Sequence, residues 1–175
     1  MSLRRLRTGE LLAGAGAVAL LVVLFLDWFE ASINRRITET SGRFVEPGLH
    51  TSGWSALGWP FVMLLVAIAG LAAWLVFVTV TDGPVSRQVA AAVLTASAGA
   101  IVLLILIVRL ALVQPGLGAR LPDAAVSVKL PAYLGLAALA ALVAGAWLAI
   151  ADERTGAPDS EYTPPPARPA PPERA

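Results

Sequence analysis

The chain lacks cysteine altogether and has a single histidine among its 175 residues. Without cysteine, disulfides, thiolate metal sites, iron–sulfur clusters and thiol–disulfide exchange are all excluded. The one histidine, His50, lies outside the apolar runs, so a single chain cannot hold a haem between two membrane histidines. The sequence therefore offers no cofactor-binding or metal-binding residues of these kinds.

Charge and catalytic motifs are also scarce. Charged residues make up 14% of the chain and the net charge is +1, so no basic surface indicates a nucleic-acid partner. The sequence contains no HExxH, P-loop or paired-aspartate motif, and Ser55 and Ser97 have no histidine or lysine partner within the apolar runs. The runs also lack a proton relay and inverted repeats with broken helices. These absences favour a protein that is not an enzyme and that has no catalytic residue.

What the chain does have is long apolar runs. A helix that spans a bilayer needs about 20 mostly apolar residues. Hydrophobic residues make up 57% of the chain, against about 45–50% in soluble domains. The runs cover residues 11–26, 57–80, 89–108 and 130–150. They predict an all-α membrane protein, a four-helix transmembrane bundle that crosses the cell (inner) membrane several times and has the lipid bilayer as its partner.

The chain divides into a transmembrane domain, residues 1–152, and a proline-rich tail, residues 153–175. The expected helices cover about 9–28, 53–81, 87–113 and 130–151. Pro60 should lie in the first turn of the second helix, where proline is tolerated. The tail has few apolar residues, so it is expected to be disordered. Its Pro166–Pro169 segment fits a PxxP pattern, which leaves a passive tail and a peptide-recognition ligand as alternatives.

The residues around the first run set the expected orientation. Arg4, Arg5 and Arg7 precede it, and positive charge before a first helix favours a cytoplasmic N-terminus. The run ends at Asp27 and Trp28 rather than at a small-x-small site, so we expect an uncleaved helix. Four spans is an even number, so both termini are predicted to be cytoplasmic.

Some of the residues expected outside the membrane have the alternation of β-strands. Segments 37–40 and 43–46 flank the turn dipeptide 41–42, which is typical of a β-hairpin. Segment 125–129 alternates in the same way. A small extracytoplasmic hairpin or three-stranded cap is one reading, and two irregular loops are the other.

Two charges are expected at similar depth near the outer surface. Asp27 ends the first helix, and Arg109 lies within apolar sequence in the third. A charge at that depth costs a few kcal/mol unless it is paired or reaches the headgroups. The sequence thus favours an Asp27–Arg109 ion pair acting as a structural clamp. The alternatives are a proton or anion site, or two side chains that reach the interface independently.

Aromatic residues gather at the same boundary. Trp28, Phe29, Trp54 and Trp59 are expected to form an interfacial aromatic belt, with a ligand platform around Trp54 as the alternative.

Small residues recur at a four-residue spacing along three of the runs. Such stripes let membrane helices approach closely, either within one bundle, which we favour, or between two copies. The stripes are Gly9, Ala13 and Ala17; Ala92, Ala96 and Ala100; and Ala137, Ala141, Gly145 and Ala149.

Four short motifs carry a resemblance to a known class of proteins. They are 27–29 (DWF), 52–56 (SGWSA), 133–136 (YLGL) and 145–149 (GAWLA) leading to Asp152-Glu153. The chain resembles small uncharacterised four-span membrane proteins of high-GC Gram-positive (actinobacterial) bacteria. The resemblance implies an inner-membrane location and brings no activity or site residues.

Together these observations favour a non-enzymatic accessory, assembly or interaction subunit, with a membrane-protein partner or a homo-oligomer. The alternative is a small-solute or ion transporter working as an oligomer, and a membrane enzyme comes third.

Overall fold

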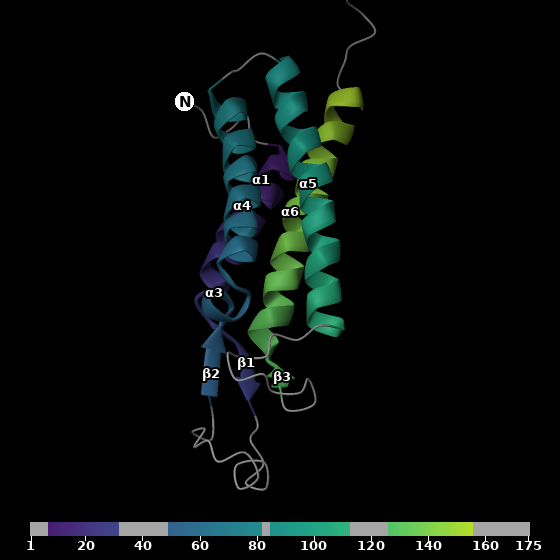
Figure 1. Ribbon diagram of the computed structural model, residues 1–175. Helices are drawn as coiled ribbons and strands as arrows, with labels where there is room; N and C mark the ends of the chain where they lie inside the picture. Colours follow the sequence, from purple (N-terminus) through teal and green to yellow (C-terminus); the bar gives the residue numbers. More distant parts are fainter. Residues whose placement is uncertain (1–6, 32–48, 82–84, 113–125, 156–175) are drawn as a thin grey trace, which may run out of the picture.

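The computed structural model describes residues 7–31, 49–81, 85–112 and 126–155. These residues form a helical bundle with a small β-sheet at one end (Figure 1). In chain order the elements are α1 (Thr8–Val23), β1 (Asp27–Ala31), β2 (Leu49–Ser52), α3 (Gly53–Ala56), α4 (Trp59–Val80), α5 (Val85–Ala111), β3 (Val126–Val128) and α6 (Leu130–Thr155). The predicted hairpin arms, 37–40 and 43–46, and the tail from residue 156 onward lie outside the described residues.

Within the described ranges, three helices are long and apolar enough to cross a bilayer: α4, α5 and α6. Their composition confirms that the chain is built as a membrane-spanning protein. α1 is also apolar but has 16 residues, which is short for a span.

The four long helices form a closed ring. α1 packs against α4 and α6, and α5 packs against the same two helices, so α1 and α5 occupy opposite corners. The chain runs alternately toward and away from the sheet, and the start of α1 and the end of α6 lie at the end opposite the sheet (Figure 1). α4 and α5 pack against each other and run in opposite directions (Figure 1).

The first predicted helix, 9–28, is too long at its C-terminal end. α1 stops at Val23, and the N–H groups of Phe25 and Leu26 bond to the carbonyls of Val22 and Val23 in tight turns. The chain then extends into β1, so Trp28 lies in a strand. Pairing with two other strands satisfies the backbone groups that a longer helix would have used.

The second predicted helix, 53–81, is divided into α3 and α4. Gly58 separates them with φ 77°, a left-handed conformation that glycine adopts without steric cost. Pro60 follows in the first turn of α4, as predicted, where its missing N–H has no helical partner to lose. At the other end of the chain, α6 continues to Thr155, beyond the predicted boundary at 152. No glycine or proline lies between Ala146 and Thr155, so the sequence has no helix-breaking residue there before Gly156.

The sheet is antiparallel with the order β2-β1-β3. On the central strand β1, Glu30 pairs with His50 of β2 on one side and with Ser127 of β3 on the other. A three-stranded sheet was one of the two expected readings, and β3 falls within the predicted 125–129. The other two strands are 27–31 and 49–52, which have too few alternating residues to stand out from the sequence.

Packing differs between the two ends of the bundle. Near the sheet, the buried side chains are large, among them Leu24, Trp28 and Phe29. A second cluster contains Leu75 and otherwise alanines. Its alanines are Ala13, Ala91, Ala92, Ala96, Ala146 and Ala149.

The closest approach between helices is the α1–α6 seam, formed by Gly9, Ala13 and Gly16 against the 138–149 part of α6. A Cβ atom on Gly9 would lie 2.6 Å from the backbone nitrogen of Ala149, and one on Gly16 would lie 2.7 Å from that of Leu142. A Cβ atom on Gly145 would overlap the backbone nitrogen of Ala13. Two backbones therefore meet directly, which is how small residues join helices in lipid.

Candidate functional site at the sheet end

Trp28 closes the bundle at the sheet end. Its side chain is fully buried, and the indole N–H donates a hydrogen bond of 2.7 Å to the carbonyl oxygen of Val23. The ring lies between two glycines. A Cβ atom on Gly53 would be 2.7 Å from Trp28 Cε2, and one on Gly135 would be 2.5 Å from Cη2. Any side chain at either glycine would therefore collide with the indole.

Backbone hydrogen bonds hold these elements around the ring. Gly53 and Trp54, at the start of α3, donate to the carbonyls of Leu26 and Leu24 at 3.2 and 3.0 Å. Lys129 N–H, just before α6, donates to the Trp28 carbonyl at 2.8 Å. Three of the four motifs found in the sequence thus meet at one point, because Trp28, Gly53 and Gly135 come from 27–29, 52–56 and 133–136.

The four candidate interfacial aromatics divide into two pairs. Trp28 and Phe29 are both fully buried, whereas Trp54 is 42% exposed and Trp59 is 76% exposed. Trp54 also stacks on Phe25, with the ring centroids 5.5 Å apart. The belt expectation therefore does not describe Trp28 and Phe29, which pack inside the bundle, and stays a prediction for Trp54 and Trp59. The register of β1 against β2 is irregular between Asp27 and Phe29, and this break in the strand alternation accompanies the burial of both adjacent side chains.

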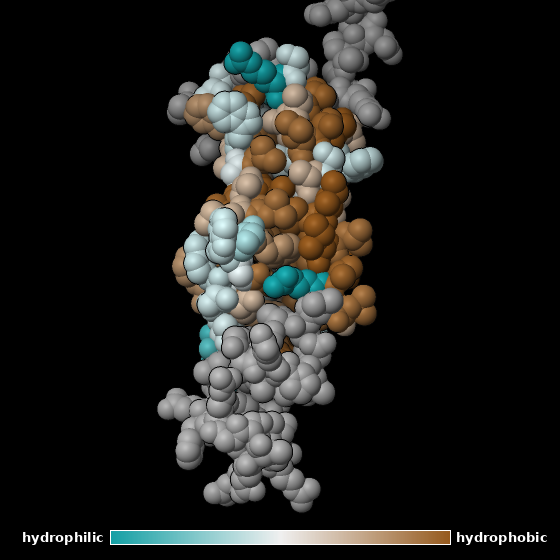
Figure 2. Space-filling view, in the orientation of Figure 1, coloured by the Kyte–Doolittle hydropathy of each residue, from teal (hydrophilic) through white to brown (hydrophobic). Residues whose placement is uncertain are grey.

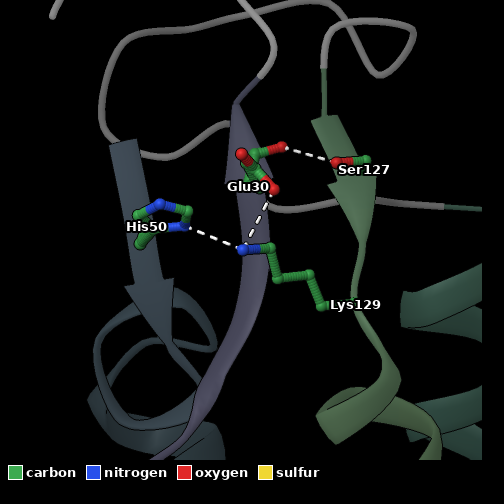
Figure 3. Close-up of polar contacts among 4 residues, drawn as sticks. All are labelled: Glu30, His50, Ser127 and Lys129. Carbon is green, nitrogen blue, oxygen red and sulfur yellow. Dashed lines mark hydrogen bonds and ion pairs between the residues drawn. The ribbon is translucent and has the colours of Figure 1, made fainter. Parts of the chain in front are cut away.

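On the sheet itself, polar side chains from three elements meet around Lys129 (Figure 3). Its ammonium nitrogen lies 3.0 Å from Glu30 Oε2 and 2.9 Å from His50 Nδ1. Ser127 Oγ donates to the Glu30 backbone carbonyl at 3.1 Å. Lysine is only a donor, so Nδ1 accepts and a neutral His50 ring carries its proton on Nε2. The cluster ties all three strands together.

The charges in this cluster act on one another. The hydrogen bond from the Lys129 ammonium lowers the pKa of the Glu30 carboxyl below its ordinary 4.5, and the positive charge of Lys129 acts in the same direction. Lys129 thus bridges a carboxylate on β1 and an imidazole on β2. Among the described residues, no three histidine, aspartate or glutamate side chains gather as a metal site would require. The arrangement suits stabilisation and recognition.

Sequence reasoning did not find this cluster. His50, Glu30 and Lys129 are distant in the chain, and only the strand register places Glu30 opposite His50. The alternation at 125–129 was the one available signal, since it predicted a strand that ends at Lys129.

Asp27 and Arg109, the ion pair predicted from the sequence, are placed as follows. Among the described residues, no ion pair or hydrogen bond joins these two side chains. Asp27 is exposed at the start of β1, whereas Arg109 is half-buried near the end of α5. Matched depth was the basis of the prediction, but α1 and α5 lie at opposite corners of the ring. The Arg109 guanidinium instead lies over the Phe61 ring, with Cζ 5.8 Å from its centroid.

The small-residue stripes on α1 and α6 are largely used within the bundle. Gly9, Ala13, Gly145 and Ala149 belong to the α1–α6 seam, while Ala137 is exposed. These contacts follow the favoured reading of packing within one bundle, and they leave Gly9 and Gly145 no room for a second copy.

No family model, curated protein or solved structure matches this chain.

Proposed function

We propose that this protein is a non-enzymatic membrane subunit that acts by binding another protein at its sheet end. The single observation that carries the proposal is the closure of the bundle by Trp28. The indole is fully buried in the space between α3 and α6, and this dense packing at the sheet end favours a role at the protein surface over passage of a solute at that point.

The sheet end is the surface best suited to a protein partner. It presents ordered polar groups, Glu30, His50 and Lys129, on a rigid three-stranded support (Figure 3). The connection from β1 to β2 begins and ends there, as does the connection from α5 to β3. By contrast, apolar side chains form a band over the bundle on the face drawn in Figure 2, which suits lipid.

The proposal includes four spans with both termini in the cytoplasm. α1 is about 24 Å long at 1.5 Å per residue, and Leu24, Phe25 and Leu26 continue its apolar surface. It packs against α4 and α6, two helices long enough to span, and extends between the same two ends of the bundle (Figure 1). With both termini cytoplasmic, as the arginines before the first apolar run favour, the proposed position of the sheet is on the extracytoplasmic side of the cell membrane.

A cross-linking experiment tests this function. Ser127 and Ser97 are both exposed serines whose hydroxyls bond a backbone carbonyl, on the sheet and in the middle of α5 respectively. A photo-cross-linking residue at 127 should give a cross-link to one different protein, and the matched variant at 97 should not. The same protein should co-purify in constant stoichiometry in mild detergent.

Two results would contradict the proposal. Cross-links from both positions to a second copy alone would favour the alternative, an oligomeric small-solute or ion transporter. A different protein captured at 97 but not at 127 would move the contact surface from the sheet to the helices.

A further inference from the structure

Arg109 is a charged side chain within an apolar span. It lies in the last turn of α5, two residues before the helix ends at Ala111. Its neighbours Ile107, Val108 and Leu112 are all exposed apolar side chains. Arg109 itself is half-buried, so it lies at the edge of the lipid-facing surface if α5 spans a bilayer.

The guanidinium has unused hydrogen-bonding capacity. Its Nε atom is buried and has no hydrogen-bond partner within the described residues. Within the described residues no carboxylate pairs with it, because Glu30 is bound to Lys129 and no ion pair joins Asp27 to Arg109. A guanidinium has five N–H donors, and leaving a buried donor unpaired is costly.

The position of Arg109 along the bundle identifies what can reach it. Phe61, which lies under the guanidinium, is the third residue of α4 and follows the exposed Trp59 by two positions. Exposed tryptophans are typical of the headgroup level of a bilayer. An arginine at that level reaches lipid phosphates because its apolar stem lies along the helix surface while the guanidinium extends to the headgroups.

We propose that Arg109, supported by the Phe61 ring, binds the phosphate of an anionic phospholipid in the leaflet at the sheet end. The planar guanidinium fork matches two phosphate oxygens, and such charge-assisted bonds are among the strongest that proteins form. The ring face below holds the cation in place through a cation–π contact. Since Arg109 has no carboxylate partner in the described structure, its charge favours a lipid with net negative charge over a zwitterionic one.

Lipid binding to the full-length protein tests this site. Short-chain phosphatidylglycerol and phosphatidylcholine are titrated in neutral detergent, and bound lipid is counted by native mass spectrometry. Wild-type protein should prefer phosphatidylglycerol, and Arg109→Gln should weaken that binding about tenfold or more, as loss of hydrogen bonds to a charged group predicts. The control is Arg87→Gln, an exposed arginine at the other end of α5, which should leave the preference intact.

Each remaining outcome is decisive. Phe61→Leu keeps the charge and removes the ring, so it should weaken phosphatidylglycerol binding even if Arg109→Gln fails to fold. Inorganic phosphate that competes equally with the lipid would identify a free anion as the ligand and overturn the lipid assignment. Equal binding of both lipids by wild-type protein, or an unchanged preference in folded Arg109→Gln, would overturn the site.

Discussion

The α1–α6 seam and the Trp28 closure use glycine for opposite purposes. In the seam, Gly9, Gly16 and Gly145 remove side chains so that two backbones meet. At the sheet end, Gly53 and Gly135 remove side chains so that one large ring fits between two helices. Lipid solvates apolar side chains as well as the protein interior does, so close packing stabilises both regions. The comparison shows that each of these five glycines marks either a helix contact or a recess.

Removing the large ring should have the largest effect. Trp28→Ala empties the space between Gly53 and Gly135 and leaves the Val23 carbonyl without its indole donor. A buried tryptophan replaced by alanine typically costs about 3–5 kcal/mol. Unfolding in mixed detergent micelles measures the loss, with Trp59→Ala as the control because Trp59 is exposed. Similar small losses in both variants would show that the ring does not hold the sheet end together.

Adding a single methyl group to the seam should have the next largest effect. Gly145→Ala places a Cβ atom where the backbone of Ala13 lies, and overpacking of this kind costs about 1–3 kcal/mol. The same substitution at Gly70 is the matched control, because a Cβ atom there would meet nothing within 4 Å. Gly70→Ala should be neutral or slightly stabilising, since alanine is the better helix former. Equal loss in both variants, read from melting temperature in detergent, would contradict the seam.

The polar cluster on the sheet should contribute least. The pKa of Glu30 is lowered by Lys129, so its contribution to stability is present at neutral pH and is lost as the pH falls through the folded-state pKa, below 4.5. Glu30→Gln removes that contribution at every pH. The melting temperatures of wild-type protein and Glu30→Gln should therefore differ slightly at about pH 7 and converge at about pH 3. A difference that stays constant or widens on acidification would show that the ion pair does not stabilise the sheet.

Much of the helical framework could be predicted from the sequence. The apolar runs correspond to α1, α4, α5 and α6, and β3 lies within the predicted 125–129. Helix ends were less reliable. The first helix was extended through Trp28 because no glycine or proline lies between Gly16 and Trp28 to stop it. The break at Gly58 was missed because a single glycine is common in apolar helices of this chain.

The site was harder to predict than the helices. Sequence motifs pointed to Trp28, Gly53 and Gly135 separately, but nothing in them said that the indole lies between the two glycines. The prediction placed Asp27 and Arg109 at a similar depth in the membrane. Depth alone does not say on which side of the bundle each residue lies. In the structure Asp27 lies on β1 and Arg109 on α5, and no ion pair joins them within the described residues.

The sequence by itself determined which segments are apolar helices and which chemistry is missing, because length, composition and the absence of cysteine are properties of the chain alone. Tertiary structure alone decided that Trp28 and Phe29 are buried, that Lys129 bridges Glu30 and His50, and that Arg109 lies over Phe61. The physical reason is that each of these contacts joins residues from different elements. Their meeting depends on strand register and on the order of helices around the ring, which local composition does not specify.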